Sequence, residues 1–373
     1  MIRTVKVRLR VTKQQEQKLW KSAGVSRYAY NWALARQEEC YRNGGKFLND
    51  SVLRKEFTLL KRQEGYGWLY ETSNNITKQA IKDACNAYKL FFKGQNKCPR
   101  FKSRHRTRPS FYNDNIKLKF RGDMFLIEKV GWVRISEQER ITADKFHNPR
   151  IIFDGRYWYI NVGIETEMPE QNLSEETIGI DLGIKDLAIC SDGKRYKNIN
   201  KSSKCKKQNK KLRRLQRRVS KKYEINKERG KFVKTRNIIK LEKRIKLIHR
   251  KIANMRLDHI HQTTTAIVKT KPCRIVMENL NIKGMMKNKH LSKAIADQGL
   301  YNFKSILKYK CKDYGIELIE ADRFYPSSKM CCVCRNINND LKLSDRVYKC
   351  PYCGNKMDRD LQASINLSRY KVS

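Results

Sequence analysis

Residues 178–190 read Ile178-Gly179-Ile180-Asp181-Leu182-Gly183-Ile184-Lys185-Asp186-Leu187-Ala188-Ile189-Cys190. The apolar residues predict a buried strand, a turn softened by glycine and a second strand. The first strand carries one carboxylate, Asp181. An ionised carboxylate in an apolar strand costs free energy unless it is paired or binds a cation. Asp181 therefore needs a partner from another part of the chain.

Two later stretches supply further acids. Residues 274–280 read Arg-Ile-Val-Met-Glu-Asn-Leu and predict another apolar strand, with Glu278 at its C-terminal end. Residues 358–367 read Asp-Arg-Asp-Leu-Gln-Ala-Ser-Ile-Asn-Leu and predict a helix with an acidic first turn. Carboxylates from separate segments are the hard oxygen ligands that Mg²⁺ prefers. A pair of such ions clamps the attacking and leaving oxygens of a phosphodiester.

Each acid has a simpler interpretation when it is taken alone. Asp181 could form an ion pair with one of the many lysines, and Glu278 could be a surface or cap acid. Asp358 and Asp360 could each be a helix N-cap, and the residues alone leave both open as the third acid.

The composition indicates a nucleic-acid partner. The chain has 373 residues, a formal net charge of +46 and a pI near 10.0. Dispersed Lys and Arg at this density favour a long polyanion over a small phosphate ligand. An anionic membrane is the competing partner, but the sequence has no apolar run of transmembrane length. The first residues lack an apolar signal-peptide core, so we expect a cytoplasmic, nucleoid-associated protein that is not secreted.

Four of the twelve cysteines form a metal-binding pattern. Cys331 and Cys334 form one CxxC pair, and Cys350 and Cys353 form another after fifteen intervening residues. This is zinc-ribbon spacing, and four thiolates close a tetrahedral site, so we expect one structural Zn²⁺. Cys332 is not expected to be a ligand. Redox dithiols and an iron–sulfur centre are the alternatives.

The pattern predicts a multidomain α/β chain. Residues 1–11 alternate as a strand, residues 12–114 are helical with a break near Gly24, and residues 115–166 return to strands. We expect the strands of 1–11 and 115–166 to form one small β-barrel with the helical block inserted. Residues 167–177 are polar and acidic and predict a linker.

The second half, residues 178–373, predicts an RNase H-like α/β layer. Residues 201–265 predict a basic hairpin of two antiparallel helices with a break near Gly230. Its positive charge exceeds what pairing along the helices could neutralise, so phosphate contact is expected. The zinc segment, residues 327–356, precedes the last acidic helix and is therefore an insertion into this layer.

Three segments resemble the RuvC motifs of TnpB, the nuclease of insertion-sequence transposons and a relative of type V CRISPR effectors. They are Gly-Ile-Asp-Leu-Gly at 179–183, Glu-Asn-Leu-Asn-Ile-Lys-Gly-Met at 278–285 and Asp-Arg-Asp-Leu-Gln-Ala-Ser-Ile-Asn at 358–366. Further stretches resemble landmarks of the same family: residues 27–34, 91–94, 99–102 and 325–329. The resemblance extends over most of the chain.

The resemblance implies a wedge barrel, an inserted helical recognition domain and a RuvC nuclease domain interrupted by the zinc module. It implies an RNA-guided DNA endonuclease of a transposable element that cuts beside a short adjacent motif. The catalytic set carried over is Asp181, Glu278 and Asp360, holding two Mg²⁺. Gln362 stands where the family usually has Asn, and Arg335 stands where Gly often follows the second knuckle cysteine.

The partners implied are a guide RNA from the transposon end and double-stranded target DNA, bound by a monomer. Base pairing would read sequence and leave the protein to hold backbones. The residues expected at nucleic acid are Tyr30, Asn31, Ser73, Asn74, Lys78, Gln79, Arg100, Lys102, Lys210, Arg213, Arg214 and Arg217.

Three alternatives stay open from the sequence. The first is a nuclease-inactive, RNA-guided DNA-binding regulator, although such a protein would lose the acids that are intact here. The second is a guide-free RuvC-type nuclease or transposase. The third is a ribosome-associated zinc-ribbon protein, which explains charge and zinc but not the three acidic motifs.

Overall fold

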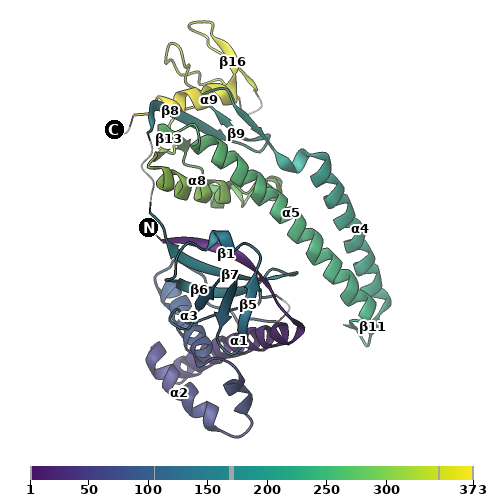
Figure 1. Cartoon of the computed structure of the whole chain (residues 1–373). Coiled ribbons are helices and arrows are strands. Elements are labelled where there is room, and N and C mark those ends of the chain that lie inside the picture. Colours follow the sequence, from purple (N-terminus) through teal and green to yellow (C-terminus); the bar gives the residue numbers. More distant parts are fainter. Residues whose placement is uncertain (1, 105, 168–171, 343–344, 372–373) are drawn as a thin grey trace. The chain divides into compact units, whose positions relative to one another are not determined.

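The computed structural model describes residues 2–104, 106–167, 172–342 and 345–371, and the chain forms two compact units (Figure 1). The N-terminal unit is Met1–Glu167 and the C-terminal unit is Met168–Ser373. Both units contain helices and strands, so the chain is mixed α/β, as predicted. Within the described ranges, no helix is both long enough and apolar enough to span a membrane.

The N-terminal unit contains a seven-stranded antiparallel sheet with the order β2-β6-β7-β1-β5-β4-β3. Strand β1 joins its two halves, because Ile2 to Arg8 pair with β7 whereas Leu9 and Arg10 pair with β5. The strands are β1 (Ile2–Arg10), β2 (Ser110–Tyr112), β3 (Lys119–Arg121), β4 (Met124–Ile127), β5 (Gly131–Ile135), β6 (His147–Phe153) and β7 (Trp158–Glu165).

The helices of this unit follow β1 directly. They are α1 (Lys13–Arg42), α2 (Asp50–Arg62), the 3₁₀ turn η1 (Gly67–Glu71) and α3 (Asn74–Phe92), with a second 3₁₀ turn, η2 (Gln138–Arg140), after β5. Thr12 and Gln15 form a capping box that starts α1. The predicted break near Gly24 is wrong, because α1 continues through it. A single helical glycine costs about 1 kcal/mol, and the buried residues Ala23 and Val25 on either side offset this cost.

Two predicted boundaries need correction. The helical block of residues 12–114 includes a strand, since Ser110–Tyr112 pairs with β6. Three residues carry too little pattern to be recognised without their partner strand. Of the predicted linker 167–177, residues 168–171 lie outside the described part, and β8 already begins at Ser174, which pairs with Pro272.

The C-terminal unit is built on a five-stranded sheet with the order β10-β9-β8-β13-β14. The first three strands are antiparallel neighbours, whereas β13 runs parallel to both β8 and β14. The strands are β8 (Ser174–Leu182), β9 (Asp186–Cys190), β10 (Arg195–Lys197), β13 (Pro272–Glu278) and β14 (Glu317–Ala321).

Helices cover both faces of this sheet, with α9 on one face and α5 and α8 on the other (Figure 1). The α5/α8 face buries a large apolar core that includes Ile180, Met277 and Phe303. On the α9 face, Val276 packs with Leu367. The remaining elements are η3 (Ile199–Lys201), α4 (Ser203–Ile225), β11 (Lys227–Glu228), β12 (Lys231–Phe232), α5 (Arg236–Val268), α6 (Ile282–Met285), α7 (Ser292–Gln298), α8 (Leu300–Tyr314), β15 (Val347–Lys349), β16 (Lys356–Asp358) and α9 (Arg359–Ser368).

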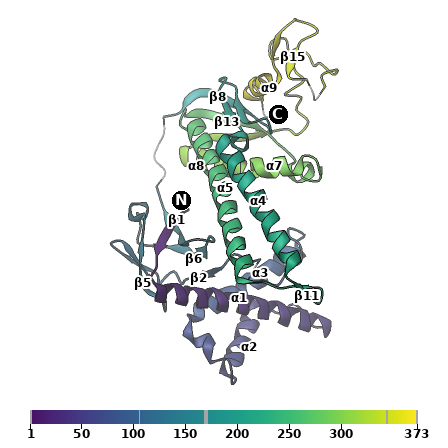
Figure 2. The same ribbon diagram turned by 90° about the vertical axis from the view of Figure 1, so that its right-hand side faces the viewer.

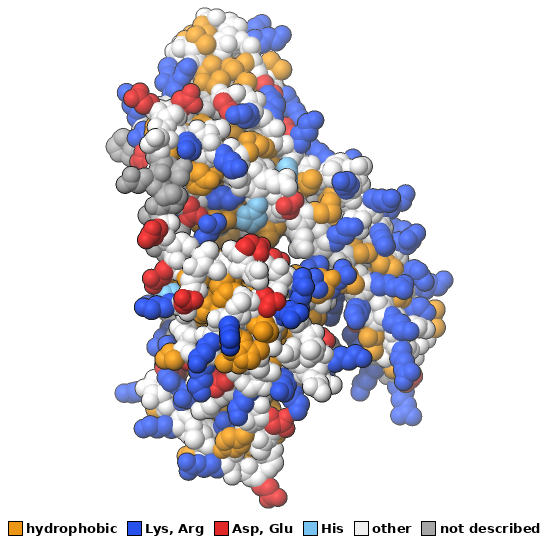
Figure 3. Space-filling view, in the orientation of Figure 1, with side chains coloured by type: hydrophobic (Ala, Val, Ile, Leu, Met, Phe, Trp, Pro, Cys, Tyr) orange, Lys and Arg blue, Asp and Glu red, His pale blue; other side chains and the backbone are white. Residues whose placement is uncertain are grey.

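Helices α4 and α5 run side by side as a hairpin, closed by the β11–β12 turn that contains Gly230 (Figure 1, Figure 2). An apolar seam joins the two helices. It includes Leu212 and Leu215 from α4 and Leu241 and Ile248 from α5. Lys and Arg side chains crowd the exposed surface of this hairpin, on the right-hand side of Figure 3. The hairpin is therefore held by a narrow apolar seam and is basic outside it.

Candidate functional site

Strand alternation decides which side chains of β8 face α9. Ile178 and Ile180 lie in the core on the α5/α8 face. Successive side chains of a strand point to opposite faces, so Gly179 and Asp181 belong to the α9 face. The acid of the first motif is therefore directed away from the large core.

Glu278 reaches the same face from β13. Met277 lies in the α5/α8 core and Val276 lies in the small core beneath α9, so Glu278, two residues after Val276, is on the α9 face. In the parallel register Met277 pairs with Ile180. One residue further along each strand are Glu278 and Asp181, which makes the two acids neighbours.

Helix α9 brings the third acid because its backbone lies directly on β8. A Cβ atom added at Gly179 would lie 1.9 Å from the carbonyl oxygen of Ser364 and 2.4 Å from the amide nitrogen of Ser368. Glycine is the residue that permits such a close approach. Asp360 lies in the first turn of this helix.

The electrostatics show that the three acids influence one another. Burial, and then the charges of Glu278 and Asp360, raise the pKa of Asp181 to about 8. Burial also raises the pKa of Glu278. Asp360 pairs with Arg359 at 3.1 Å and with Arg346 at 3.8 Å. Asp181 is thus a carboxyl group whose ionisation needs additional positive charge nearby.

Asp358 has a different task from Asp360. It is the N-cap of α9, and its carboxylate accepts hydrogen bonds from the backbone N–H groups of Asp360 and Leu361, at 3.1 and 3.0 Å. It also pairs with Arg195 at 3.1 Å. Burial acts to raise its pKa, but the Leu361 hydrogen bond and Arg195 outweigh burial, so the pKa of Asp358 is lowered. The carboxylate of Asp358 is therefore engaged in capping α9.

The three acids have the donor chemistry that Mg²⁺ prefers. Three carboxylates from β8, β13 and α9 provide hard oxygen ligands, and burial, followed by the charges of Glu278 and Asp360, raises the pKa of Asp181. Among the described residues, the group with metal-binding spacing is the cysteine cluster, whose ligand atoms lie within 4.8 Å of one another. In this structure, the positive charges of Arg359 and Arg346 lie beside the negative charge of Asp360 and balance it.

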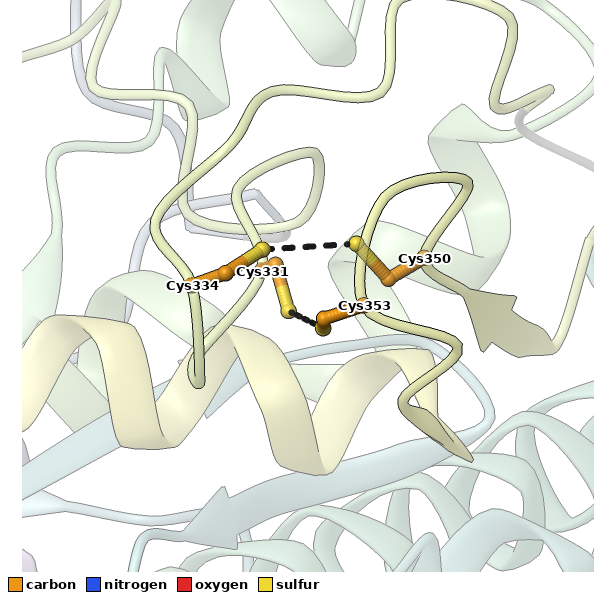
Figure 4. Close-up of side chains that lie close together, drawn as sticks. All are labelled: Cys331, Cys334, Cys350 and Cys353. Carbon is orange, nitrogen blue, oxygen red and sulfur yellow. Dashed lines mark hydrogen bonds between the residues drawn. The ribbon is translucent and has the colours of Figure 1, made fainter.

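The four predicted zinc ligands meet in one cluster (Figure 4). The Sγ atoms of Cys331 and Cys353 are 3.6 Å apart, and those of Cys334 and Cys350 are 3.5 Å apart. Zn–S bonds of about 2.3 Å in a tetrahedron place the sulfur atoms about 3.8 Å apart, so the cluster fits one Zn²⁺. A hydrogen bond from the backbone N–H of Cys353 lowers the pKa of Cys350 to about 6, which favours the thiolate that zinc binds.

The two residues that follow the knuckles share an unusual backbone conformation. Gly354 follows Cys353 with φ of +72°, and Arg335 follows Cys334 with φ of +66°. Glycine adopts this left-handed region without steric cost, whereas arginine does not. Cys332 lies outside the four-sulfur cluster, with its Sγ 3.3 Å from Sδ of Met357.

Helix α9 also holds the zinc module in place. The side-chain amide of Asn366 donates to the carbonyl oxygens of Ser327 and Met330, at 2.8 and 2.6 Å. Gln362 is fully buried and accepts a hydrogen bond of 3.5 Å from Asn355. The helix that carries Asp360 is therefore fastened to β8 on one side and to the cysteine module on the other.

Several residues predicted to contact nucleic acid have internal partners instead. Tyr30 is 7% exposed, and Nζ of Lys102 lies 3.5 Å from the centroid of its ring. Asn31 exchanges two hydrogen bonds of 2.8 Å with the backbone of Lys102. Ser73 is buried and donates to Glu128 at 2.5 Å. These side chains hold the helical region together.

The remaining residues predicted to contact nucleic acid differ in their hydrogen-bond partners and in their exposure. Asn74 accepts from Lys61 at 3.2 Å, and Gln79 donates to Asp83 at 2.8 Å. The exposed members are Asn74, Lys78, Arg100, Lys210, Arg213, Arg214 and Arg217. The last four belong to α4, and the other members of the predicted set belong to the N-terminal unit.

The arginines around the acids were not predicted from the sequence. Arg195, Arg346 and Arg359 pair with Asp358 or Asp360. Only Arg359, which stands between the two aspartates, carried a local signal. Arg195 and Arg346 become neighbours of these acids through folding alone.

Comparison with known proteins gives matches along the chain. Three family models match the chain. They are a "Helix-turn-helix domain" at residues 1–46, a "Probable transposase" at 159–289 and a "Cas12f1-like, TNB domain" at 301–367. The last of these spans the cysteine cluster and α9, and the second spans Asp181 and Glu278. These matches support the resemblance to the TnpB family.

Relatives match this chain over nearly its whole length. The Escherichia coli (strain K12) protein named "Putative RNA-guided DNA endonuclease InsQ" is 28% identical, over 98% of this chain and 91% of that protein. A Streptomyces pristinaespiralis protein named "Putative RNA-guided DNA endonuclease" is also 28% identical, over 98% and 88%. Among solved structures, the Cas12f1–sgRNA–target DNA complex matches with a TM-score of 0.60 at 18% identity, covering 96% of this chain and 83% of that chain.

Proposed function

We propose that this protein is an RNA-guided DNA endonuclease of a transposable element. One observation carries the proposal: β8, β13 and α9 bring Asp181, Glu278 and Asp360 to one face of the sheet, where burial, and then the charges of Glu278 and Asp360, raise the pKa of Asp181 to about 8. The names of the relatives favour the same activity. The five-stranded sheet, in which β8, β9 and β10 are antiparallel neighbours and β13 runs parallel to β8 and β14, supports the proposed RNase H-like, RuvC-type layer.

Three carboxylates would hold the metal ions. Asp181, Glu278 and Asp360 would together hold the two Mg²⁺ ions. Bound Mg²⁺ lowers the pKa of the attacking water and stabilises the leaving oxygen of the phosphodiester. Asp358 keeps the first turn of α9 in place, and Gly179 sets the distance of that helix from β8. With one such set in the described ranges, both DNA strands would be cut in turn at the same site.

The basic surface supports a nucleic-acid partner. Lys210, Arg213, Arg214 and Arg217 are exposed on α4, outside the apolar seam with α5. Exposed Lys and Arg at this density bind phosphates and release counterions, without reading sequence. This suits a protein whose guide RNA supplies the sequence specificity.

The test has two stages. The protein is expressed with its native flanking DNA, and the RNA that co-purifies with it is sequenced. One dominant RNA that ends in sequence from beyond the element is expected. That RNA then programmes cleavage of a matching DNA target, by wild-type protein and by Asp181→Ala.

Cleavage that needs the guide and Mg²⁺ and is lost in Asp181→Ala supports the proposal. Cleavage without guide would favour the guide-free nuclease, and guided binding with no cleavage by wild-type protein would favour the regulator. A mixture of ribosomal and transfer RNA fragments with no dominant species would indicate binding by charge alone.

A further inference from the structure

The N-terminal unit has a depression of about 660 Å³ where β1, β5 and β7 meet the start of α1. This is within the range of small-ligand sites, about 300–1,000 Å³. We call it the Arg8 pocket, and its defining side chains are Arg8, Arg10, Arg134, Arg156, Trp132 and Trp158. Nothing in the proposed cleavage chemistry uses these residues.

The charge of the Arg8 pocket selects for anions. Four arginines line it, against one acid, Glu16. Two of the arginines are occupied at their Nε atoms, since Arg134 pairs with Asp123 at 3.2 Å and Arg10 donates to Ser136 at 3.1 Å. The arginine excess remains after these pairings are counted.

The guanidinium group of Arg8 is held in one orientation by an aromatic ring. Its guanidinium lies 3.5 Å from the centroid of the Tyr157 ring, and Arg156 approaches the same ring at 4.8 Å. Stacking on an aromatic ring keeps the planar guanidinium in one orientation. The Nε atom of Arg8 is buried and has no hydrogen-bond partner in the described part of the chain.

A second orphaned donor lines the same pocket. Trp158 is 1% exposed, and its indole N–H has no hydrogen-bond partner among the residues that the structure covers. A buried donor without a partner costs free energy, and both of these donors belong to residues that line the pocket. Water could bond either donor, but water alone does not explain the arginine excess.

Trp132 supplies a flat apolar surface at this pocket. Its side chain is 40% exposed although it sits on β5, beside well-packed strands. An exposed tryptophan next to arginines is the combination that stacks nucleobases while the backbone phosphate is neutralised.

We propose that the Arg8 pocket binds one unstacked nucleotide of a single-stranded nucleic acid, with the base against Trp132 and the phosphate at the arginines. The inference rests on the proposed binding of nucleic acid, but not on cleavage. It predicts a nucleotide-sized site on the sheet of the N-terminal unit, separate from the three acids. RNA and DNA strands share this chemistry.

The test uses the full-length protein and fluorescein-labelled single strands of about 10 nucleotides, as RNA and as DNA of the same sequence. Affinity is measured by anisotropy across a salt series for wild type, Trp132→Leu, Arg8→Lys and Trp68→Leu. Trp68 is the matched control, because it is also 40% exposed but lies outside the pocket. Circular dichroism and thermal melting check that each variant folds.

Trp132→Leu and Arg8→Lys are expected to weaken binding about five-fold or more, the range for losing one base–aromatic stack. Neither variant changes the charge, so the slope of log affinity against log salt should not change. Loss with RNA alone, or with DNA alone, would identify the strand. If wild-type protein binds the strands and both variants bind them with the same affinity, the proposed nucleotide site in the Arg8 pocket is wrong, but the proposed function is not affected. Failure of wild-type protein to bind either strand would overturn the proposed function as well.

Discussion

Gly179 of β8 and Ser364 of α9 are in backbone contact: a methyl group added to Gly179 would lie 1.9 Å from the Ser364 carbonyl oxygen. This contact fixes the distance between the strand that carries Asp181 and the helix that carries Asp360. A glycine two residues before an acid thus controls where the third acid lies.

Gly179→Ala is expected to destabilise the C-terminal unit by about 1–3 kcal/mol, the usual cost of overpacking, and to abolish cleavage. The clash is with backbone, so no side-chain rotation relieves it. Thermal melting and cleavage assays measure the two effects. Gly24→Ala is the control, because its added methyl group meets nothing within 4 Å, and it should be neutral or slightly stabilising. Equal melting of wild type and Gly179→Ala would contradict the contact.

Asp181→Asn is expected to change the pH dependence of stability. Burial, with Glu278 and Asp360, raises the pKa of Asp181 from 3.8 to about 8. A raised carboxyl pKa stabilises the fold below about pH 4, and this contribution is lost as the pH rises to about 8. In metal-free buffer, the Tm of Asp181→Asn should therefore rise relative to wild type across this window.

Added Mg²⁺ should remove that advantage, because a bound cation compensates the ionised carboxylate that only wild type has. Asp192→Asn serves as the control, since Asp192 is exposed and pairs with Lys194. A Tm difference between Asp181→Asn and wild type that stays constant with pH would refute the electrostatic account.

Asp358 and Asp360 are separated by asparagine substitutions. Asparagine caps helices about as well as aspartate, so Asp358→Asn should keep the fold of α9 and most of the cleavage activity. Asp360→Asn removes a proposed metal ligand and should lower the cleavage rate at least about a hundred-fold. Rates measured at saturating Mg²⁺ check this, and the opposite ranking would make Asp358 the third ligand.

Zinc content distinguishes the cluster cysteines from their neighbour. Cys353→Ser is expected to lose the single zinc ion and to lower the melting temperature, because structural zinc contributes folding energy. Cys332→Ser changes an adjacent thiol outside the cluster and should retain one zinc per chain. Elemental analysis of the purified proteins measures both. Iron in wild type, or loss of zinc in Cys332→Ser, would contradict the assignment.

Arg335→Gly is expected to stabilise the zinc module by about 1 kcal/mol, since arginine at φ of +66° pays a steric cost that glycine avoids. The gain should appear as slower zinc loss to a chelator. Gly354→Ala, at φ of +72°, should accelerate zinc loss for the same reason. Unchanged rates in both variants would mean that the two turns are not strained.

Local patterns carried most of what could be predicted. The alternation of Ile178, Ile180 and Leu182 marked β8, and the spacing of two CxxC pairs marked the cluster that the structure brings together. Both signals depend on residues a few positions apart. Strand β2 and the start of β8 were missed, because each depends on a partner strand far away in the sequence.

By itself, the sequence indicated most of the strands, the basic hairpin, the two CxxC pairs and the three acidic motifs, because residue type and short-range periodicity encode them. Only the tertiary structure decided that Asp358 caps α9 while Asp360 belongs with Asp181, and that Tyr30, Asn31 and Ser73 have internal partners. It alone gathered Arg8, Trp132 and Trp158 into one pocket. These relationships join residues from distant segments, and such contacts exist only once the chain has folded and its long-range packing is complete.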